Sequence, residues 1–180
     1  LPSQFPWCPP SKMVDTFAAQ RNGIKTGQGR RLRSIDHLMQ AHERDFGIAS
    51  LVRCSFCKMK DGECKTSGDV IPSAFTKPDT LAIIERCATT HLKALPPTVR
   101  HVVLLGTADA YIKKTRAIFS RLYPNFTSVN EAAFRAGGAL WVYAAHPSPA
   151  NGHFESWVSG PQENASARKK ILAQRALTDA

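Results

Sequence analysis

Three short apolar runs stand out along the chain, separated by longer stretches of mixed apolar and polar residues. They are Ile48 to Val52, His101 to Leu105 and Ala139 to Ala145. None of the three alternates between apolar and polar positions, and all are rich in Val, Leu and Ala. Runs of this kind are typical of strands that are covered on both faces. We therefore predict three buried strands at these positions.

Between the runs, apolar residues recur at helical spacing. One predicted helix follows Gly29 and carries Leu32, Ile35, Leu38, Met39 and Phe46. A second is capped by Thr76, has Pro78 and Asp79 in its first turn, and directs Leu81, Ile84 and Leu92 inward.

Three more helices are expected further along. Thr107 can cap a helix that carries Ile112 and Phe119. Ser128 and Glu131 form a capping box for a short helix that Gly137-Gly138 would end. A final helix is expected from about Ser166 to Leu177.

Strands that alternate with helices predict an α/β fold with a parallel sheet. Such sheets bind ligands in the crevice beyond the carboxyl ends of their strands. The segments that follow the three apolar runs are therefore the places to look for a site. They contain Arg53-Cys54, Gly106-Thr107 and His146-Pro147-Ser148-Pro149.

The last of these segments is the most unusual. Two prolines flank Ser148, and Asn151-Gly152 follows, so the chain is expected to form a rigid, exposed turn. Ser148 and the backbone amides can donate hydrogen bonds to a phosphate, and His146 can donate to developing negative charge. The alternative is a proline turn that ends a strand beside a core histidine.

The net charge of the chain also favours a partner that contains phosphate groups. The 180 residues contain 24 Lys and Arg against 14 Asp and Glu, a formal net charge of +10. This surplus favours a polyanionic partner, because each neutralised phosphate releases counterions; a generically basic protein is the alternative. No window approaches the roughly 20 apolar residues of a membrane span, and Leu1 to Pro10 does not resemble a signal peptide. With an odd count of five cysteines, we expect a reducing compartment, cytoplasmic or nuclear, and no membrane association.

The string Leu140-Trp141-Val142-Tyr143-Ala144-Ala145 followed by His146-Pro147-Ser148-Pro149 resembles the second active-site motif of uracil-DNA glycosylases. Similarity to this superfamily extends over about residues 23 to 160. It includes residues 23–29, 48–54 and 102–106, and Cys87, which matches a cysteine of the iron–sulfur branches.

The resemblance implies one domain over residues 1–180, a three-layer α/β/α sandwich with a short, mostly parallel four-stranded sheet. It also implies a monomeric DNA glycosylase of base excision repair, which flips a uracil-like deaminated base out of DNA and hydrolyses its N-glycosidic bond. His146 would stabilise the departing base. Pro147, Ser148, Pro149, Asn151 and Gly152 would hold the DNA backbone, and Ser50 and Ile24 would line the base pocket.

The sequence departs from the family at three places. The first active-site motif should fall near Trp7-Cys8-Pro9-Pro10-Ser11, which has no carboxylate to activate water. Ile24 replaces a base-stacking aromatic residue, and Ser50 replaces an asparagine that reads uracil. The chain is thus either a divergent glycosylase or a catalytically degenerate nucleic-acid-binding module on the same fold. A third possibility is an unrelated α/β protein.

Four cysteines suggest a metal site. Cys54, Cys57, Cys64 and Cys87 are enough thiols for one zinc ion or iron–sulfur cluster. The family resemblance supports Cys54 and Cys87 as cluster ligands. The alternative is four thiols without metal, with Cys87 packed as a small apolar group on its helix. Three lysines at 58, 60 and 65 and glycines at 62 and 68 predict a basic hairpin here, either a metal knuckle or a DNA-contacting insertion.

Several further residues are candidates for DNA contact. Arg30, Arg31 and Arg33 open a predicted helix, where a phosphate would offset their charge; otherwise they form a solvated first turn. His153 and Phe154 could wedge into a groove, although Phe154 and Trp157 fit local packing as well. We expect the cations at 113, 114 and 116 to form an exposed helix face.

Overall fold

The computed structural model describes residues 24–25, 31–32, 47, 49, 51–52, 58–65, 75–147, 151–161 and 163–179. The chain divides into two compact units, Leu1–Ile48 and Ala49–Ala180. In the first unit, β1 (Ile24–Lys25) pairs antiparallel with β2 (Arg31–Leu32). Leu32 thus lies in a strand and not in the helix predicted after Gly29; the other four apolar residues of that helix lie outside the described residues.

The predicted basic hairpin is confirmed as a hairpin. β3 (Lys58–Lys60) pairs antiparallel with β4 (Glu63–Lys65). The two residues between them, Asp61 and Gly62, have positive φ angles of 54° and 79°. An Asp-Gly pair with two positive φ angles is the preferred two-residue hairpin turn, because its twist matches that of the strands.

Among the described residues, the main sheet of the second unit has four strands in the order β5-β8-β7-β6. β5 (His101–Leu105) and β8 (Ala139–Ala144) are parallel, and both coincide with predicted strands. β7 (Ala133–Ala136) runs antiparallel to β8 and to β6 (Thr127–Asn130).

The mixed α/β class and the four-stranded sheet are therefore confirmed. The expectation of a mostly parallel sheet is wrong, because two of the three strand pairings in this sheet are antiparallel. The run Ile48 to Val52 was expected to supply another strand. Its described residues, at positions 49, 51 and 52, are not in a strand, and Leu51 packs instead against the core as a partly buried side chain.

The short helix predicted between Ser128 and Gly137 is also wrong, because this segment forms β6, β7 and the turn into β8. Gly137 and Gly138 have φ angles of 59° and 83° and form the two-residue turn that pairs Ala136 with Ala139. Two consecutive positive φ angles fit a hairpin turn. The glycine pair that was expected to end a helix therefore joins two strands.

Three predicted helices are confirmed: α3 (Pro78–Leu92), α4 (Asp109–Leu122) and α6 (Ala165–Thr178). The N-caps of α3 and α4 are Lys77 and Ala108, one residue later than predicted, and neither makes a side-chain capping hydrogen bond. α6 is capped by Asn164, whose side chain accepts from the Ser166 amide at 2.8 Å. A short helix, α5 (Phe154–Ser159), precedes it.

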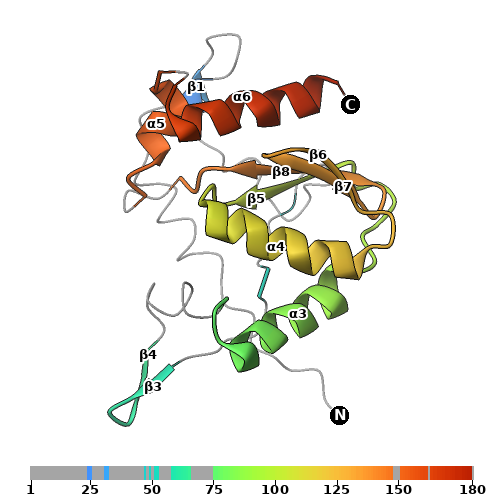
Figure 1. Ribbon diagram of the computed structural model, residues 1–180, viewed down its shortest axis with the longest axis vertical. Helices are drawn as coiled ribbons and strands as arrows, with labels where there is room; N and C mark the ends of the chain where they lie inside the picture. The colour runs from blue at the N-terminus through green and yellow to red at the C-terminus, as the bar shows by residue number, and fades with distance from the viewer. Residues whose placement is uncertain are drawn as a thin grey trace. The chain divides into compact units, whose positions relative to one another are not determined.

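The helices cover both faces of the sheet (Figure 1). On one face, α4 packs on an aromatic cluster in which Phe119 and Trp141 have ring centroids 4.5 Å apart. On the other face, Ala173 and Ala176 of α6 pack on Leu140 and Val142. Because successive residues of β8 point to opposite faces, this one strand, buried at five of its six positions, joins both clusters. Its position in the sheet is thereby fixed from both sides.

Candidate active site

Two chain segments leave the sheet together at the carboxyl ends of β5 and β8. The two strands are parallel and in register, with Leu105 opposite Ala144. The Gly106 amide donates to the Ala144 carbonyl at 2.7 Å and so extends the pairing by one residue. Gly106-Thr107 and His146-Pro147 therefore emerge side by side. This is the edge at which α/β sheets commonly bind ligands.

His146 lies just after the end of β8, and its carbonyl is hydrogen-bonded to the side chain of Asn151. The imidazole is exposed, and Pro147 after it is half-buried. The Asn151 amide nitrogen donates to the His146 carbonyl at 2.7 Å, and its side-chain oxygen accepts from the His153 amide at 3.2 Å. One side chain thus joins the two ends of the loop. Asn151, predicted to contact the DNA backbone, holds its own loop in place.

The remaining residues of the predicted phosphate loop are only partly described. Ser148 and Pro149 lie outside the described residues, whereas Gly152 is exposed in the turn before α5. A Cβ at position 152 would meet nothing within 4 Å. The loop therefore has open space beside it at this position.

The connection from β5 to α4 is tightly packed by comparison. Gly106 has a φ angle of 151°, and a Cβ at this position would lie 2.7 Å from the ring of Tyr111. Only glycine fits there without strain. The Tyr111 ring makes edge-to-face contacts with Phe75 and Tyr143, at centroid distances of 5.8 and 6.2 Å. Burial, with a smaller contribution from Tyr143, raises the pKa of Tyr111 to about 12, so that its hydroxyl stays protonated at neutral pH.

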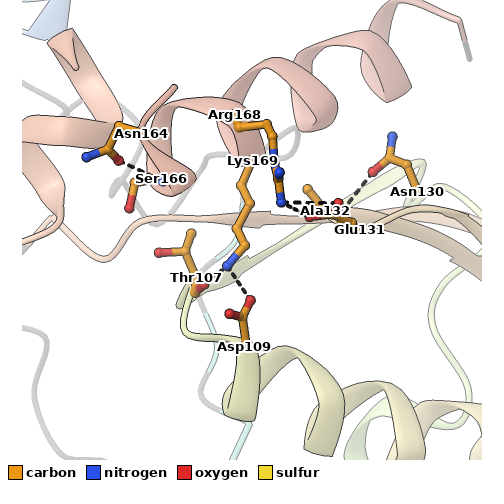
Figure 2. A network of polar contacts seen from close by, with 9 residues as sticks. All are labelled: Thr107, Asp109, Asn130, Glu131, Ala132, Asn164, Ser166, Arg168 and Lys169. Carbon is orange, nitrogen blue, oxygen red and sulfur yellow. Dashed lines mark hydrogen bonds and ion pairs between the residues drawn. The ribbon is translucent and has the colours of Figure 1, made fainter. Parts of the chain in front are cut away.

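A buried lysine also reaches this connection from the other side of the sheet (Figure 2). Lys169 of α6 donates to the Thr107 carbonyl at 2.7 Å and to the Asp109 carboxylate at 2.5 Å. The Lys169 side chain is 7 % exposed and that of Asp109 is 92 % exposed. The hydrogen bond from Lys169 and then its charge lower the pKa of Asp109; partial burial opposes this, and the charge of Arg168 makes the smallest contribution. Asp109 therefore stays ionised to lower pH than an unpaired aspartate would.

Sequence reasoning missed Tyr111, Asp109 and Lys169. A signal for Lys169 was available, because it stands at helical spacing within a stripe of small residues that α6 buries: Ser166, Ala173 and Ala176. A lysine in a buried stripe needs a partner. The partner itself, 60 residues earlier in the chain, could not be read from the sequence.

The residues predicted to line the base pocket are described only in part. Ile24 lies in β1, in the first compact unit. Ser50 and the stretch Trp7 to Ser11 lie outside the described residues. The base-pocket roles predicted for Ile24 and Ser50 stay predictions.

The predicted metal ligands are described only in part. Cys54 and Cys57 lie outside the described residues, and Cys64 lies in β4. Cys87 is buried on α3, 3 % exposed. Within the described part of the chain, no three His, Cys, Asp or Glu residues form a group that could hold a metal ion. An iron–sulfur cluster or zinc ion therefore stays a prediction, which absorption near 400 nm and metal analysis would test.

The cations of α4 have two different environments. Lys113 and Lys114 are exposed, as expected. Arg116 is half-buried: its guanidinium donates to Ser128 Oγ at 2.9 Å, to the Ala133 carbonyl at 2.7 Å and to the Asn130 carbonyl. The expectation of an exposed face is wrong for Arg116, because this side chain ties α4 to the β6–β7 hairpin.

The aromatic residues after the loop fit the packing alternative. Phe154 and Trp157 of α5 are half-buried, and Trp157 packs against the cluster beneath α6. His153 is exposed at the N-cap of α5.

No helix among the described residues is long and apolar enough to cross a membrane. Comparisons of the chain with protein-family models, with curated proteins and with solved structures find no match.

Proposed function

We propose that this chain is a DNA glycosylase that flips a uracil-like deaminated base out of DNA and hydrolyses its N-glycosidic bond. The observation that carries the proposal is the position of His146-Pro147. These residues leave β8 at the carboxyl edge of its parallel pairing with β5, beside Gly106-Thr107. The described end of the string that resembles the glycosylase motif, His146-Pro147, thus lies where a substrate crevice is expected in an α/β sheet.

Each part of the loop has a chemical role in this proposal. His146 donates a hydrogen bond to the base as negative charge develops on it, a contribution of roughly 3–4 kcal/mol in a preorganised site. Ser148 and the prolines beside it hold a backbone phosphate. Ser50 lines the base pocket, and the three-layer arrangement of the family belongs to the same proposal.

Charge supports DNA as the partner. The formal net charge is +10, and the exposed Lys113 and Lys114 lie near the start of α4, the helix that begins at this edge. Cations near a substrate crevice attract the DNA backbone and release its counterions. We therefore expect binding that weakens steeply with salt.

Cleavage of lesion-containing DNA tests the proposal. The protein is incubated with DNA that carries uracil, hypoxanthine or xanthine, and alkali then breaks the strand at abasic sites. We expect scission at one or more of these lesions, and a loss of about 10²-fold or more in rate for His146→Ala. His101→Ala is the matched control, because His101 is an exposed histidine at the opposite end of β5. No scission at any lesion would exclude the enzyme.

The second candidate is a nucleic-acid-binding module without turnover. The lack of a carboxylate in the stretch Trp7 to Ser11 favours it. Salt-dependent DNA binding by the wild-type protein, with no scission at any lesion, would establish this alternative in place of the first.

A further inference from the structure

One carboxylate lies at the edge where the glycosylase chemistry is proposed. Asp109 is the first residue of α4 and follows the end of β5 by four positions. Its side chain is 92 % exposed, so solvent reaches it. Among the described residues only Lys169 bonds to the Asp109 carboxylate, through Oδ1. The second oxygen, Oδ2, is available to a water molecule or a substrate.

Lys169 fixes this carboxylate in place. Burying an ammonium group is costly unless it is paired and hydrogen-bonded. Lys169 meets this need with two acceptors, the Asp109 carboxylate and the Thr107 carbonyl. Because the second acceptor is backbone, the position of the Lys169 ammonium is fixed relative to the β5–α4 connection. A long surface side chain would give Asp109 no comparable constraint.

The Lys169–Asp109 pair is not a typical surface ion pair. The neighbouring pair on the same helix, Arg168 with Glu131, joins two side chains that are both more than half exposed. Such surface pairs contribute little to stability. The Lys169–Asp109 pair differs because one partner is buried and the other is presented to solvent at the ligand-binding edge (Figure 2).

We propose that Asp109 is the catalytic carboxylate of this site, binding the water that attacks the sugar, and that Lys169 is its positioning residue. The proposal rests on the glycosylase function proposed above. It supplies the group that the stretch Trp7 to Ser11 lacks.

The reaction balances with groups of this chain and one water molecule. The N-glycosidic bond breaks, and its electron pair stays on the base nitrogen, where His146 stabilises the anion. Asp109 stabilises the positive charge that develops on the sugar, as a carboxylate does in glycoside hydrolysis. The water oxygen bonds to C1′ and its proton passes to Asp109, which then returns a proton to the base. The products are the free base and an abasic sugar.

Asp109 is a weak base, but a proton transfer late in the reaction does not require a strong one. Water becomes strongly acidic only as its oxygen bonds to C1′, so a weakly basic carboxylate can accept the proton late in the step. Before then the carboxylate acts through its charge and by orienting the water. That role requires it to be ionised, and Lys169 of α6, with a weaker contribution from Arg168, lowers its pKa and so extends the ionised state to lower pH.

The test is single-turnover cleavage with DNA binding measured in parallel. On the lesion that the wild-type protein cleaves, we expect Asp109→Asn to slow cleavage by about 10²- to 10⁴-fold. DNA affinity should change little, and the melting temperature should fall only slightly, because the side-chain oxygen of the variant still accepts from Lys169 although the charge is lost. Asp109→Glu should recover part of the rate. Glu131→Gln is the matched control, because it removes a carboxylate that pairs with α6 through an exposed arginine.

The pH profile separates catalysis from structural support. Lys169→Met should move the acid limb of the cleavage rate to higher pH, because the pKa of Asp109 rises towards its ordinary value when its partner is lost. A merely structural role for Lys169 would leave the limb where it is and overturn its assignment. Asp109→Asn that cleaves at the wild-type rate would overturn the role of Asp109 and leave the glycosylase standing. A wild-type protein that cleaves no lesion would overturn both.

Discussion

The two connections that leave the carboxyl edge of the sheet differ in how they are held. The β5–α4 connection is short and fixed from both sides, by the Tyr111 ring packed on Gly106 and by the buried Lys169 bonded to Thr107. The β8–α5 loop is longer and exposed at His146, and the Asn151 side chain closes it. A tightly packed connection thus lies beside a segment that is exposed at His146. Precise placement of catalytic groups requires such rigid support.

The largest expected effect on stability comes from substituting Gly106 of the β5–α4 connection, with Gly152 of the β8–α5 loop as the comparison. Gly106→Ala places a Cβ at 2.7 Å from the Tyr111 ring at a φ of 151°. We expect a loss of ~2–3 kcal/mol in the free energy of unfolding, from overpacking and backbone strain together. Gly152→Ala in the other loop meets nothing within 4 Å and should stay within about 0.5 kcal/mol of wild type. Urea denaturation of both variants checks this; equal losses would show that the two connections are held alike.

A smaller loss is expected when the lysine support is removed. Lys169→Met keeps the buried stem but leaves the Thr107 carbonyl without its donor, at a cost of about 1–2 kcal/mol. Asp109 adds little to this loss because it is exposed. The control is Lys170→Met, which removes an exposed contact to the Val158 carbonyl and should cost less than about 0.5 kcal/mol. If thermal unfolding shows no difference between the two variants, Lys169 does not support the connection.

The smallest effect on stability should come from the loop itself. Asn151→Ala removes hydrogen bonds to the His146 carbonyl and the His153 amide, at a cost of about 1 kcal/mol or less. We nevertheless expect it to slow cleavage, because His146 is no longer held. Asn125→Ala is matched to it, since Asn125 bonds the Gly137 amide in an exposed turn at the opposite edge. Equal cleavage rates for the two variants would argue against loop closure as the role of Asn151.

The sequence predicted the elements whose signals are local. β5 and β8 are recognisable as apolar runs, and α3, α4 and α6 by their helical spacing. Gly137-Gly138 misled because glycine ends helices and also forms hairpin turns, and only strand pairing decides between the two. This turn makes β7 antiparallel to β8. The prediction that the glycine pair ends a helix therefore also led to the wrong prediction of a mostly parallel sheet.

The residues of the candidate site likewise divide into those that a local pattern predicts and those that it does not. His146 was recognisable because an unusual string carries it, and its place at the strand end follows from the apolar run before it. Asp109 and Lys169 do not lie in an unusual sequence string, and their ion pair joins residues 60 positions apart. Contacts of that separation depend on how α6 packs on the sheet. No local pattern encodes them.

Release of the free base from a DNA strand with a labelled lesion tests the central claim most directly. The wild-type protein and the His101→Ala control should release the base from at least one of uracil-, hypoxanthine- or xanthine-containing DNA. His146→Ala should release it about 10²- to 10³-fold more slowly in a single turnover. Release at an equal rate by His146→Ala, or no release by the wild-type protein from any of the three, would contradict the account.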